Sequence, residues 1–399
     1  MAEVALYERE PFRRELTIEV LRADTEDGRP FVVLADTICY PEGGGQPGDR
    51  GRIAGIAITD VRRVGEEVRH YLAGPPPSGQ VRAELDWERR FDHMQQHTGQ
   101  HLLTAIAQER FGWATTAFHL GESVSDIELD TSGIDPELLQ ALEEMVAAEI
   151  RAVRPVTAWR VSPEEYAVLP VRTRGLPDGH RGDIRLVEIA GIDLNTCGGT
   201  HLRSTAELEA LTLLGTESMR GGTRLFYAAG GRVRRLLGAH HARTAQLRQL
   251  LGASDDELLS SVQLRLDQLK DAQRAIRDLQ EMLAVESARA LAGTGEPVPA
   301  AHWESQELPF LQRVAREFVR MAPEGVALLT AGRGDQGAFV LCAGDSATLD
   351  VSAAGRKIAE ILSGRGGGSG RMFQGKAAAL TRRDEALALL RGMPQPSGD

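Results

Sequence analysis

The chain has 399 residues, of which 42% are hydrophobic and 26% are charged, and its formal net charge is −11. No apolar run approaches the roughly 20 residues of a membrane helix, the N-terminus lacks a hydrophobic signal segment, and three cysteines are too few for a disulfide framework. We therefore expect two or three domains in a cytoplasmic protein. The acidic charge argues weakly against nucleic-acid binding, but nearly all basic residues are arginine, which suits phosphate and base contacts.

The N-terminal part of the chain, residues 1–86, consists of short alternating stretches separated by turn residues. Leu16, Ile18 and Val20 show the two-residue period of a half-buried strand. Further strands are expected at 31–34, 53–58 and 61–71, with turns at Asp27-Gly28, 41–51 and 74–79. These elements predict a small β-barrel or a compact sheet.

The next part, residues 87–235, mixes helical and strand patterns. Residues 87–111 have the helical period, and Gly112 is a plausible stop. A second helix is expected to begin at Asp135-Pro136, because proline suits the first helical position. Strands are expected around 156–161, 184–189, 208–214 and 225–228. The sequence therefore predicts an α+β domain here.

The third part, residues 236–299, is expected to be a helical arm with a linker. No proline interrupts 240–291, and apolar residues recur every seven positions at Val262, Leu269, Ile276 and Leu283. Such a heptad pattern is typical of coiled-coil helices. The arm could pair two helices, contact a second copy, or only space the domains. Residues 300–399 then show a helix, two strands, a helix, a glycine loop and a last helix, which predict a C-terminal α/β domain.

Two histidines in the first predicted helix, His97 and His101, lie four residues apart. On a helix this spacing places both imidazoles on one face, so they can bind the same ion. His93 precedes them in the same row, and we expect it not to bind the ion directly. No glutamate follows His97, so the helical metalloprotease motif is absent. Alone, such a pair could equally be part of a packed helix face.

A second segment, Asn195-Thr196-Cys197-Gly198-Gly199-Thr200-His201, again contains two ligand types four residues apart. The glycines allow a loop to bring the thiolate and the imidazole around one ion, and this donor set suits zinc. Alone, the segment could be a turn with a buried cysteine. Both segments together predict a Zn²⁺ site formed by four side chains, with three or all four bound at once: His97, His101, Cys197 and His201.

The motifs HTGQH and CGGTH resemble the signature of the alanyl-tRNA synthetase editing domain and of its freestanding relatives, the alanyl-tRNA editing proteins. Residues 37–51, with the run GGGQPGD, are similar to the glycine-rich motif of this family. Residues 92–96 resemble the freestanding proteins, 218–224 the end of the editing domain, and 366–371 the glycine loop of the synthetase C-terminal domain. The resemblance covers about residues 14–390, and no synthetase catalytic domain is expected.

The resemblance implies a zinc-dependent hydrolase that acts in trans on mischarged tRNA(Ala), removing serine and also glycine from the 3′ adenosine. A homodimer through the arm or the C-terminal domain is a further expectation. One alternative is a non-catalytic tRNA-binding protein with a structural zinc. Another is a zinc-dependent deacylase of a different aminoacyl-tRNA.

Selectivity for serine over alanine cannot rest on size, because alanine is the smaller residue. A polar group that needs the serine hydroxyl must be left unpaired by alanine. Thr37 and Gln46 are the predicted discriminating residues, although GGGQPGD could be only a glycine-rich turn. His119 lies in a stretch that resembles a strand entering the editing cleft, and no carboxylate stands out as a general base. Candidate tRNA contacts are Arg62, Arg63, Arg69, Arg89, Arg90, Arg365 and Arg371.

Overall fold

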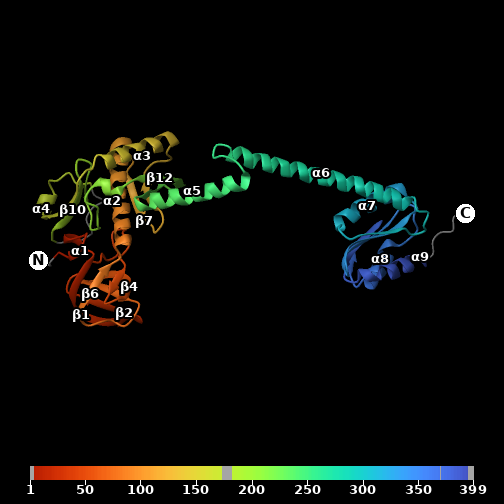
Figure 1. The fold of residues 1–399 in the computed structure, drawn as a ribbon, viewed down its shortest axis with the longest axis horizontal. Helices are drawn as coiled ribbons and strands as arrows, with labels where there is room; N and C mark the ends of the chain where they lie inside the picture. Colours follow the sequence, from red (N-terminus) through yellow and green to blue (C-terminus); the bar gives the residue numbers. More distant parts are fainter. Residues whose placement is uncertain (1–3, 173–181, 369, 394–399) are drawn as a thin grey trace. The chain divides into compact units, whose positions relative to one another are not determined.

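The computed structural model describes residues 4–172, 182–368 and 370–393, so Ser369 of the predicted glycine loop lies outside the described residues. The chain divides into two compact units, Met1–Gln246 and Leu247–Asp399 (Figure 1). The α+β fold class with an N-terminal barrel, predicted from the sequence, is confirmed. In the described ranges, no helix has both the length and the apolar composition needed to cross a membrane.

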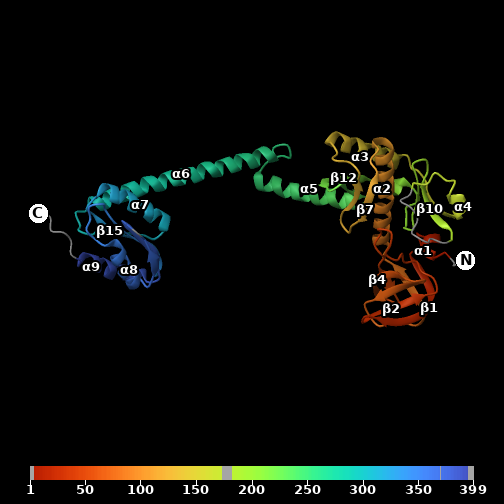
Figure 2. The ribbon, with the colours of Figure 1, turned by 180° about the vertical axis from the view of Figure 1, so that it is seen from behind.

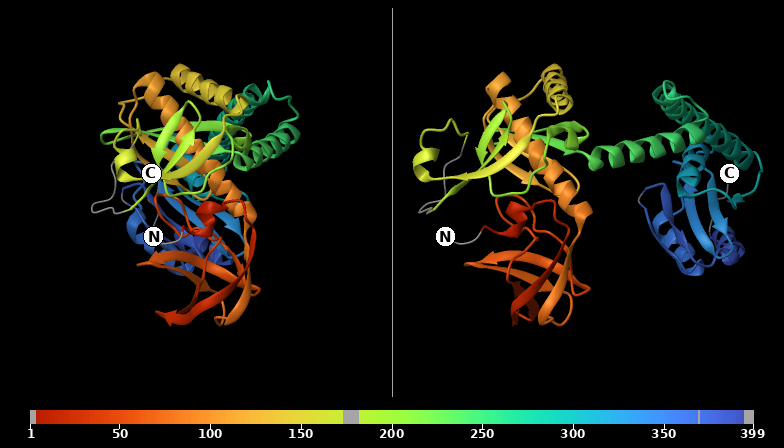
Figure 3. Two further views of the ribbon diagram at one scale, coloured as in Figure 1. Left: turned by 90° about the vertical axis from the view of Figure 1, so that its left-hand side faces the viewer. Right: turned by 60° about the vertical axis from the view of Figure 1, so that its left-hand side comes forward.

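Six strands near the N-terminus close into a barrel in the order β1-β2-β5-β4-β3-β6 (Figures 2 and 3). A short helix, α1 (Leu6–Arg9), precedes it. Apolar side chains that alternate along the strands fill its interior, including Val32, Ile53 and Val61. The strands are β1 (Glu15–Glu26), β2 (Arg29–Leu34), β3 (Gly51–Ile53), β4 (Ile56–Val64), β5 (Glu67–Leu72) and β6 (Gly79–Leu85).

Two of the strands predicted in this region were wrong, because each is two strands joined by a turn. Residues 53–58 contain a turn at Ala54 and Gly55, whose φ angles are 52° and 80°. Residues 61–71 contain a turn at Gly65, with φ of 60°. Gly55 and Gly65 suit such tight turns, because glycine adopts positive φ without strain. Apolar periodicity alone does not reveal a turn of this kind.

The helix α2 (Trp87–Phe111) links the barrel to the second domain of the first unit, at the predicted bounds. Its N-cap is Asp86, whose side chain accepts a hydrogen bond from the backbone N–H of Arg89, and it ends at Gly112 in the left-handed conformation. Every residue from His93 to Ala107 is buried. Figures 1 and 2 show α2 extending from the barrel to α3 (Pro136–Arg151), so its polar residues lie in the interior.

The second domain of the first unit surrounds α2 with two antiparallel sheets, β12-β13-β8-β7 and β11-β10-β9. β9 and β10 have the predicted bounds, whereas β12 begins three residues after the expected Leu208, because Thr205–Leu208 form a 3₁₀ turn. The remaining elements are β7 (Thr115–Leu120), β8 (Ser125–Leu129), β9 (Val156–Val161), α4 (Pro163–Tyr166), β10 (Ile184–Ile189), β11 (Asp193–Thr196), β12 (Leu211–Met219), β13 (Gly222–Ala229) and α5 (Gly231–Leu251).

A buried ion pair fixes the glycine-rich segment 37–51 to α2. Arg90 and Asp49 are in direct contact, and both side chains are 0% exposed. Arg90 also donates to the backbone oxygens of Ile38 and Pro11, and Asp49 accepts from the N–H of Tyr40. A buried pair with all of its hydrogen bonds made holds one geometry. The segment therefore has a fixed position against the helix that carries His97 and His101.

The predicted helical arm contains two helices, α5 and α6 (Leu258–Ala292). α5 ends at Leu251, Gly252 has φ of 63°, and α6 begins after this break. The heptad residues Val262, Leu269, Ile276 and Leu283 of α6 are 40–55% exposed. Only the last part of α6 is buried, where Ala284, Ala288 and Leu291 pack in one core cluster with residues of α7 (Leu308–Met321).

The rest of the second unit is a five-stranded sheet in the order β14-β15-β16-β18-β17, with one parallel pair between β14 and β15. Part of the predicted glycine loop is a strand, because Arg365–Gly367 pair with Met372–Ala377. The other elements are β14 (Ala300–Trp303), β15 (Val326–Arg333), β16 (Gln336–Ala343), α8 (Val351–Ile361) and α9 (Arg383–Arg391).

Candidate metal centre

The two predicted halves of the metal site lie together in the structure. The ligand atoms of His97, His101, Cys197 and His201 all lie within 4.8 Å of one another. The sulfur of Cys197 is 3.4 Å from Nε2 of His97 and 3.2 Å from Nε2 of His201. Three imidazoles and one thiol at these distances can surround a single tetrahedral ion. The donor set thus fits zinc, with borderline-soft sulfur and nitrogen ligands.

The first half of the centre is rigid because α2 is buried on all sides. His97 and His101 are 1% and 4% exposed, and their ring centroids are 5.2 Å apart. The second half is the loop after β11, which is too tight for a side chain at Gly199. A Cβ atom there would lie 2.2 Å from Cε1 of His97. Glycine at this position is therefore required by the close approach of the loop to the helix.

Hydrogen bonds outside the centre determine which ring nitrogen of two histidines faces it. Oε1 of Gln46 accepts from the backbone N–H of Thr200 at 3.0 Å, so this oxygen is an acceptor for Nδ1 of His97 at 2.9 Å as well. A carboxylate oxygen of Asp193 lies 3.0 Å from Nδ1 of His101. Both Nδ1 atoms therefore donate, and Nε2 of each ring is the nitrogen left to face the cluster. Such oxygen acceptors are usual behind metal-binding histidines.

The third imidazole, on His201, is held differently. Its Nδ1 lies 3.2 Å from the hydroxyl of Thr98, and that hydroxyl also accepts from the N–H of Leu202 at 3.1 Å. A hydroxyl can donate or accept, so this contact orients the ring without selecting its tautomer. Burial and the neighbouring His97 lower the pKa of His201 to about 3. His201 is therefore a neutral imidazole, the form that binds metals.

The electrostatics of the cluster favour the thiolate of Cys197. Burial raises its pKa, but the interaction with His97 and the hydrogen bonds with His101 and His201 outweigh burial, and the pKa is well below the usual value. Burial lowers the pKa of His101, but the hydrogen bonds to Asp193 and to Cys197 raise it to about 9. The thiolate is the form of cysteine that binds metals.

A cavity of about 380 Å³, called here the metal cavity, opens beside the cluster. Most of the residues that line it come from α2, β7, β11 and the loop Cys197–Gly199, and they include Gln100, Thr104 and Phe118. Gly44 of the glycine-rich segment and Arg172 also line it. The ring of Phe118 is 5.9 Å from that of His97 between centroids. In the described part of the chain, no carboxylate lines this cavity. Such a mixture of apolar and polar lining is typical of small-molecule sites.

Three residues considered from the sequence lie outside this lining. Thr37 is buried; its hydroxyl is 2.7 Å from Nε2 of His70 and accepts from the N–H of Cys39. His93 is 1% exposed, and its Nδ1 has no hydrogen-bond partner among the described residues. His119 is exposed and pairs with Asp126 at 2.9 Å. Gln46 does not line the cavity either, but it is buried in direct contact with His97.

A second group of candidate ligands, His119, Asp126 and Glu128, lies on the surface of β7 and β8. Arg224 lies beside it, 2.7 Å from Glu128 and 3.6 Å from Asp126. A guanidinium there already neutralises these carboxylates, so the group carries no second metal site.

Several predicted tRNA contacts are paired within the chain. The prediction for Arg90 was wrong, because this side chain is fully buried against Asp49. Arg62 is 2.7 Å from Asp60, Arg69 is 2.7 Å from Glu26, and Arg63 donates to the hydroxyl of Tyr7. The guanidinium groups of these arginines are thus already bound to carboxylates or to a hydroxyl of the chain itself.

Sequence reasoning missed the residues that support the metal cluster from behind. Asp193, only four residues before Cys197, pairs with Arg172 at 2.7 Å as well as with His101. Arg185 donates to the backbone oxygens of Cys197 and Gly199 at 2.6 and 2.9 Å. Asp193 and Thr98 could have been suspected from the sequence, because each lies within four residues of a candidate ligand. Nothing in the sequence near Arg185 indicated its role.

One comparison with known proteins falls in the region of the metal centre. The family model described as the threonyl and alanyl tRNA synthetase second additional domain matches residues 184–227. The crystal structure of the C-Ala domain from Aquifex aeolicus alanyl-tRNA synthetase is 24% identical, covers 24% of this chain and 86% of that one, and gives a TM-score of 0.23.

Curated relatives match nearly the full length. Alanyl-tRNA editing protein AlaX-L of Pyrococcus horikoshii is 28% identical, over 97% of this chain and 98% of the relative. Alanyl-tRNA editing protein Aarsd1 of Mus musculus is 37% identical, over 96% of this chain and 97% of the relative. At this identity and coverage, and with the HTGQH and CGGTH segments meeting in one cluster, the chain belongs to the family of alanyl-tRNA editing proteins.

Proposed function

We propose that this chain hydrolyses the aminoacyl ester of mischarged tRNA(Ala), removing serine and also glycine, at a Zn²⁺ centre held by His97, His101, Cys197 and His201. The single observation that carries the proposal is the convergence of these four side chains within 4.8 Å beside a cavity. Membership in the alanyl-tRNA editing family supports the substrate class.

The chain's own residues account for positioning rather than for proton transfer. Gln46 and Asp193 accept the Nδ1 protons of His97 and His101, which keeps both rings in fixed orientations. When bound, zinc supplies Lewis acidity toward the ester and a template for the acylated nucleotide. Phe118 gives the cavity an apolar wall against which a base or a ribose can pack.

The experiment that tests the proposal is a panel of charged tRNAs incubated with the purified chain. We expect hydrolysis of Ser-tRNA(Ala) and Gly-tRNA(Ala), with Ala-tRNA(Ala) left intact. Chelation should abolish the activity, and added zinc should restore it. Binding of tRNA without any hydrolysis would instead support the non-catalytic alternative. Hydrolysis of a different aminoacyl-tRNA in preference would identify another deacylase.

We also propose that Gln46 and Thr37 set the selectivity for serine. The carbonyl of Val32 accepts from Nδ1 of His70, so Nε2 of His70 accepts from the Thr37 hydroxyl. Thr37 therefore acts as a positioning residue for the segment that carries Gln46. Thr37 does not line the metal cavity, so it can affect the selectivity between serine and alanine only by positioning this segment.

Replacing Thr37 by valine is expected to weaken serine removal more than tRNA binding. Valine leaves the buried acceptor of His70 and the N–H of Cys39 unpaired, at a cost of about 1–3 kcal/mol, or about tenfold to a hundredfold. The Ser-tRNA(Ala) deacylation rate and the tRNA dissociation constant are measured together. Thr37→Ser keeps the hydroxyl and should restore selectivity. Equal hydrolysis by the valine variant would remove Thr37 from this role.

We further propose that α6 pairs with α6 of a second copy of this chain. Its heptad residues are exposed and recur every seven positions, the spacing by which identical helices pack together. The variant Leu269→Lys with Ile276→Lys is expected to change a dimeric mass to a monomeric one in light scattering, because lysine ammonium groups would face each other in the seam. Asp271→Lys, outside the seam, is the matched control. A monomeric wild-type chain contradicts the proposal.

A further inference from the structure

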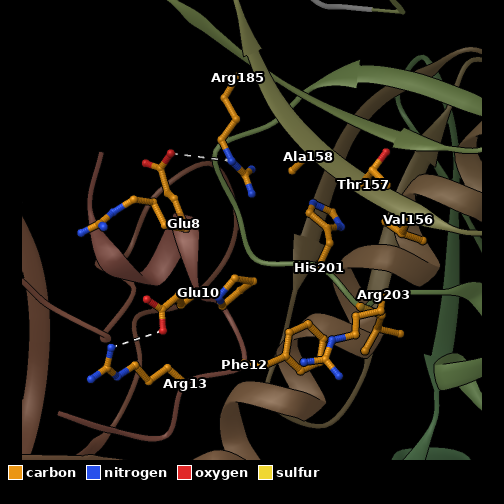
Figure 4. Close-up of a pocket in the computed structure, with 13 residues that line it drawn as sticks. Glu8, Glu10, Phe12, Arg13, Val156, Thr157, Ala158, Arg185, His201 and Arg203 are labelled. Carbon is orange, nitrogen blue, oxygen red and sulfur yellow. Dashed lines mark hydrogen bonds and ion pairs between the residues drawn. The ribbon is translucent and has the colours of Figure 1, made fainter. Parts of the chain in front are cut away.

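A second cavity in the first unit, of about 650 Å³, lies at the end of the metal-binding loop (Figure 4). The metal cavity touches Cys197–Gly199, and this one touches His201, Leu202 and Arg203. None of the described residues lines both cavities, so the second is a separate space next to the cluster. Because four arginines line it, it is called here the arginine cavity.

The charge of the arginine cavity is opposite to that of the chain. Among the described residues its lining contains four arginines and two carboxylates, Glu8 and Glu10, whereas the chain carries a net charge of −11. One of the four, Arg9, is paired with Asp36 at 2.6 Å, which leaves a smaller positive excess. The arginines come from different elements: the end of α1, the segment before β1, β10 and the metal-binding loop, as Arg9, Arg13, Arg185 and Arg203. A local excess of positive charge in an acidic protein indicates an anionic ligand.

The floor of the cavity offers a flat, cationic stacking surface. The guanidinium carbon of Arg203 lies 3.9 Å from the centroid of the Phe12 ring, and Figure 4 shows the two side chains one over the other. Arg203 is exposed, and it forms no ion pair with another described residue. Stacked arginine and aromatic planes are the surfaces on which unpaired RNA bases pack.

Arg13, the residue after Phe12, offers a place for a phosphate. Among the described residues, the carboxylate paired with Arg13 is that of Glu10, at 3.2 Å, and Arg13 also donates to the backbone oxygen of Glu15. The two side chains of this pair are 40% and 51% exposed, and exposed pairs are weak, so a phosphate can replace Glu10 as the partner. Arg185 is not assigned to the phosphate, because its guanidinium donates hydrogen bonds to the backbone oxygens of Cys197 and Gly199.

We propose that the arginine cavity binds an unpaired nucleotide from the 3′ end of the tRNA, with its base on Arg203 and Phe12 and its phosphate at Arg13. This inference rests on the proposed function, since it takes the RNA to be the tRNA whose acylated terminal nucleotide enters the metal cavity. Both cavities meet the loop Cys197–Arg203, so a nucleotide close to the terminal one along the strand can reach the second cavity.

The test compares two RNAs: deacylated tRNA(Ala) with a complete 3′ end, and the same tRNA lacking its unpaired 3′ nucleotides. The full chain should bind the complete tRNA more tightly. Arg203→Ala is expected to weaken binding of the complete tRNA about tenfold, the effect of losing one stacked base, and to leave binding of the truncated tRNA unchanged. Arg13→Ala should act likewise through the phosphate.

Control variants separate the stack from general charge. Arg203→Lys keeps the charge but not the planar stack, so it should lose most of the affinity that alanine loses. Arg52→Ala, which removes an exposed arginine of the barrel outside the cavity, should change neither affinity. Arg203 and Arg13 are both exposed, and unchanged melting temperatures verify that the variants fold.

Three outcomes overturn the inference: equal binding of both RNAs by the wild-type chain, no loss in Arg203→Ala, or equal losses with both RNAs. All are binding results that need no hydrolysis. A wild-type chain that discriminates the two RNAs in this way but cleaves no ester refutes the proposed activity instead. Failure of one proposal is therefore distinguishable from failure of the other.

Discussion

Alanine in place of Gly199 is expected to lower Ser-tRNA(Ala) deacylation at least about a hundredfold, the cost of misplacing a catalytic group by about 1 Å. The new Cβ would lie 2.2 Å from Cε1 and 2.4 Å from Nδ1 of His97, and 2.8 Å from Oε1 of Gln46, whereas Cβ contacts under 3.0 Å are essentially never seen. Because α2 is buried, the loop has to move away. Cys197 and His201 move with it, and the cluster opens.

The neighbouring Gly198 provides a matched control for this prediction. A Cβ atom there meets nothing within 4 Å. Of the described glycines, those with φ in the left-handed region do not include Gly198 or Gly199, so alanine adds no backbone strain at either position. Gly198→Ala should therefore keep its zinc, measured beside Gly199→Ala; zinc content is the control readout because Gly198 lines the metal cavity. A Gly199→Ala chain with wild-type rate and zinc content would show that the loop does not approach His97 closely.

Replacing Cys197 by alanine is expected to reduce zinc retention strongly and to lower deacylation about a thousandfold. The substitution removes the sulfur that lies 3.2–3.4 Å from two of the imidazoles. Losing the metal removes several kcal/mol of stabilisation of the developing charge, and about 4 kcal/mol corresponds to about a thousandfold in rate. Metal content after exhaustive dialysis and single-turnover rates are the measurements.

Cys342→Ala serves as the control for Cys197→Ala. Cys342 is buried in the second unit, where burial raises the pKa of its thiol to about 12. This variant should retain zinc and activity, because it removes a neutral thiol from a separate core. If Cys197→Ala also retains both, the thiolate is not a ligand.

The elements with local signals could be predicted from the sequence. α2 has its N-cap at Asp86 and its stop at Gly112, both visible as residue types, and its apolar period is regular. The turns at Ala54 and Gly65 were missed because apolar residues occur on both sides of each turn, where the two strands pair with each other. The break after Gly252 was missed for a similar reason, since a heptad pattern does not exclude a change of direction.

The clustering of the four candidate side chains was predicted from the sequence, but the contacts that support them were not. Four-residue spacing identifies His97 with His101 and Cys197 with His201, because it is a local pattern. Gln46 reaches Thr200 across 154 positions, and Arg90 reaches Asp49 across 41. Such contacts depend on how the barrel packs against α2, which no local pattern encodes. Arg90 therefore resembled a surface charge in the sequence, although it is buried.

The most direct test of the central claim is X-ray absorption at the zinc edge of the purified chain, combined with its zinc content. We predict one zinc ion per chain, with one sulfur at about 2.3 Å and the remaining ligands nitrogen at about 2.0–2.1 Å. In Cys197→Ala the sulfur signal should be absent. A wild-type chain that binds no zinc, or binds it through oxygen and nitrogen alone, would contradict the assignment of this centre.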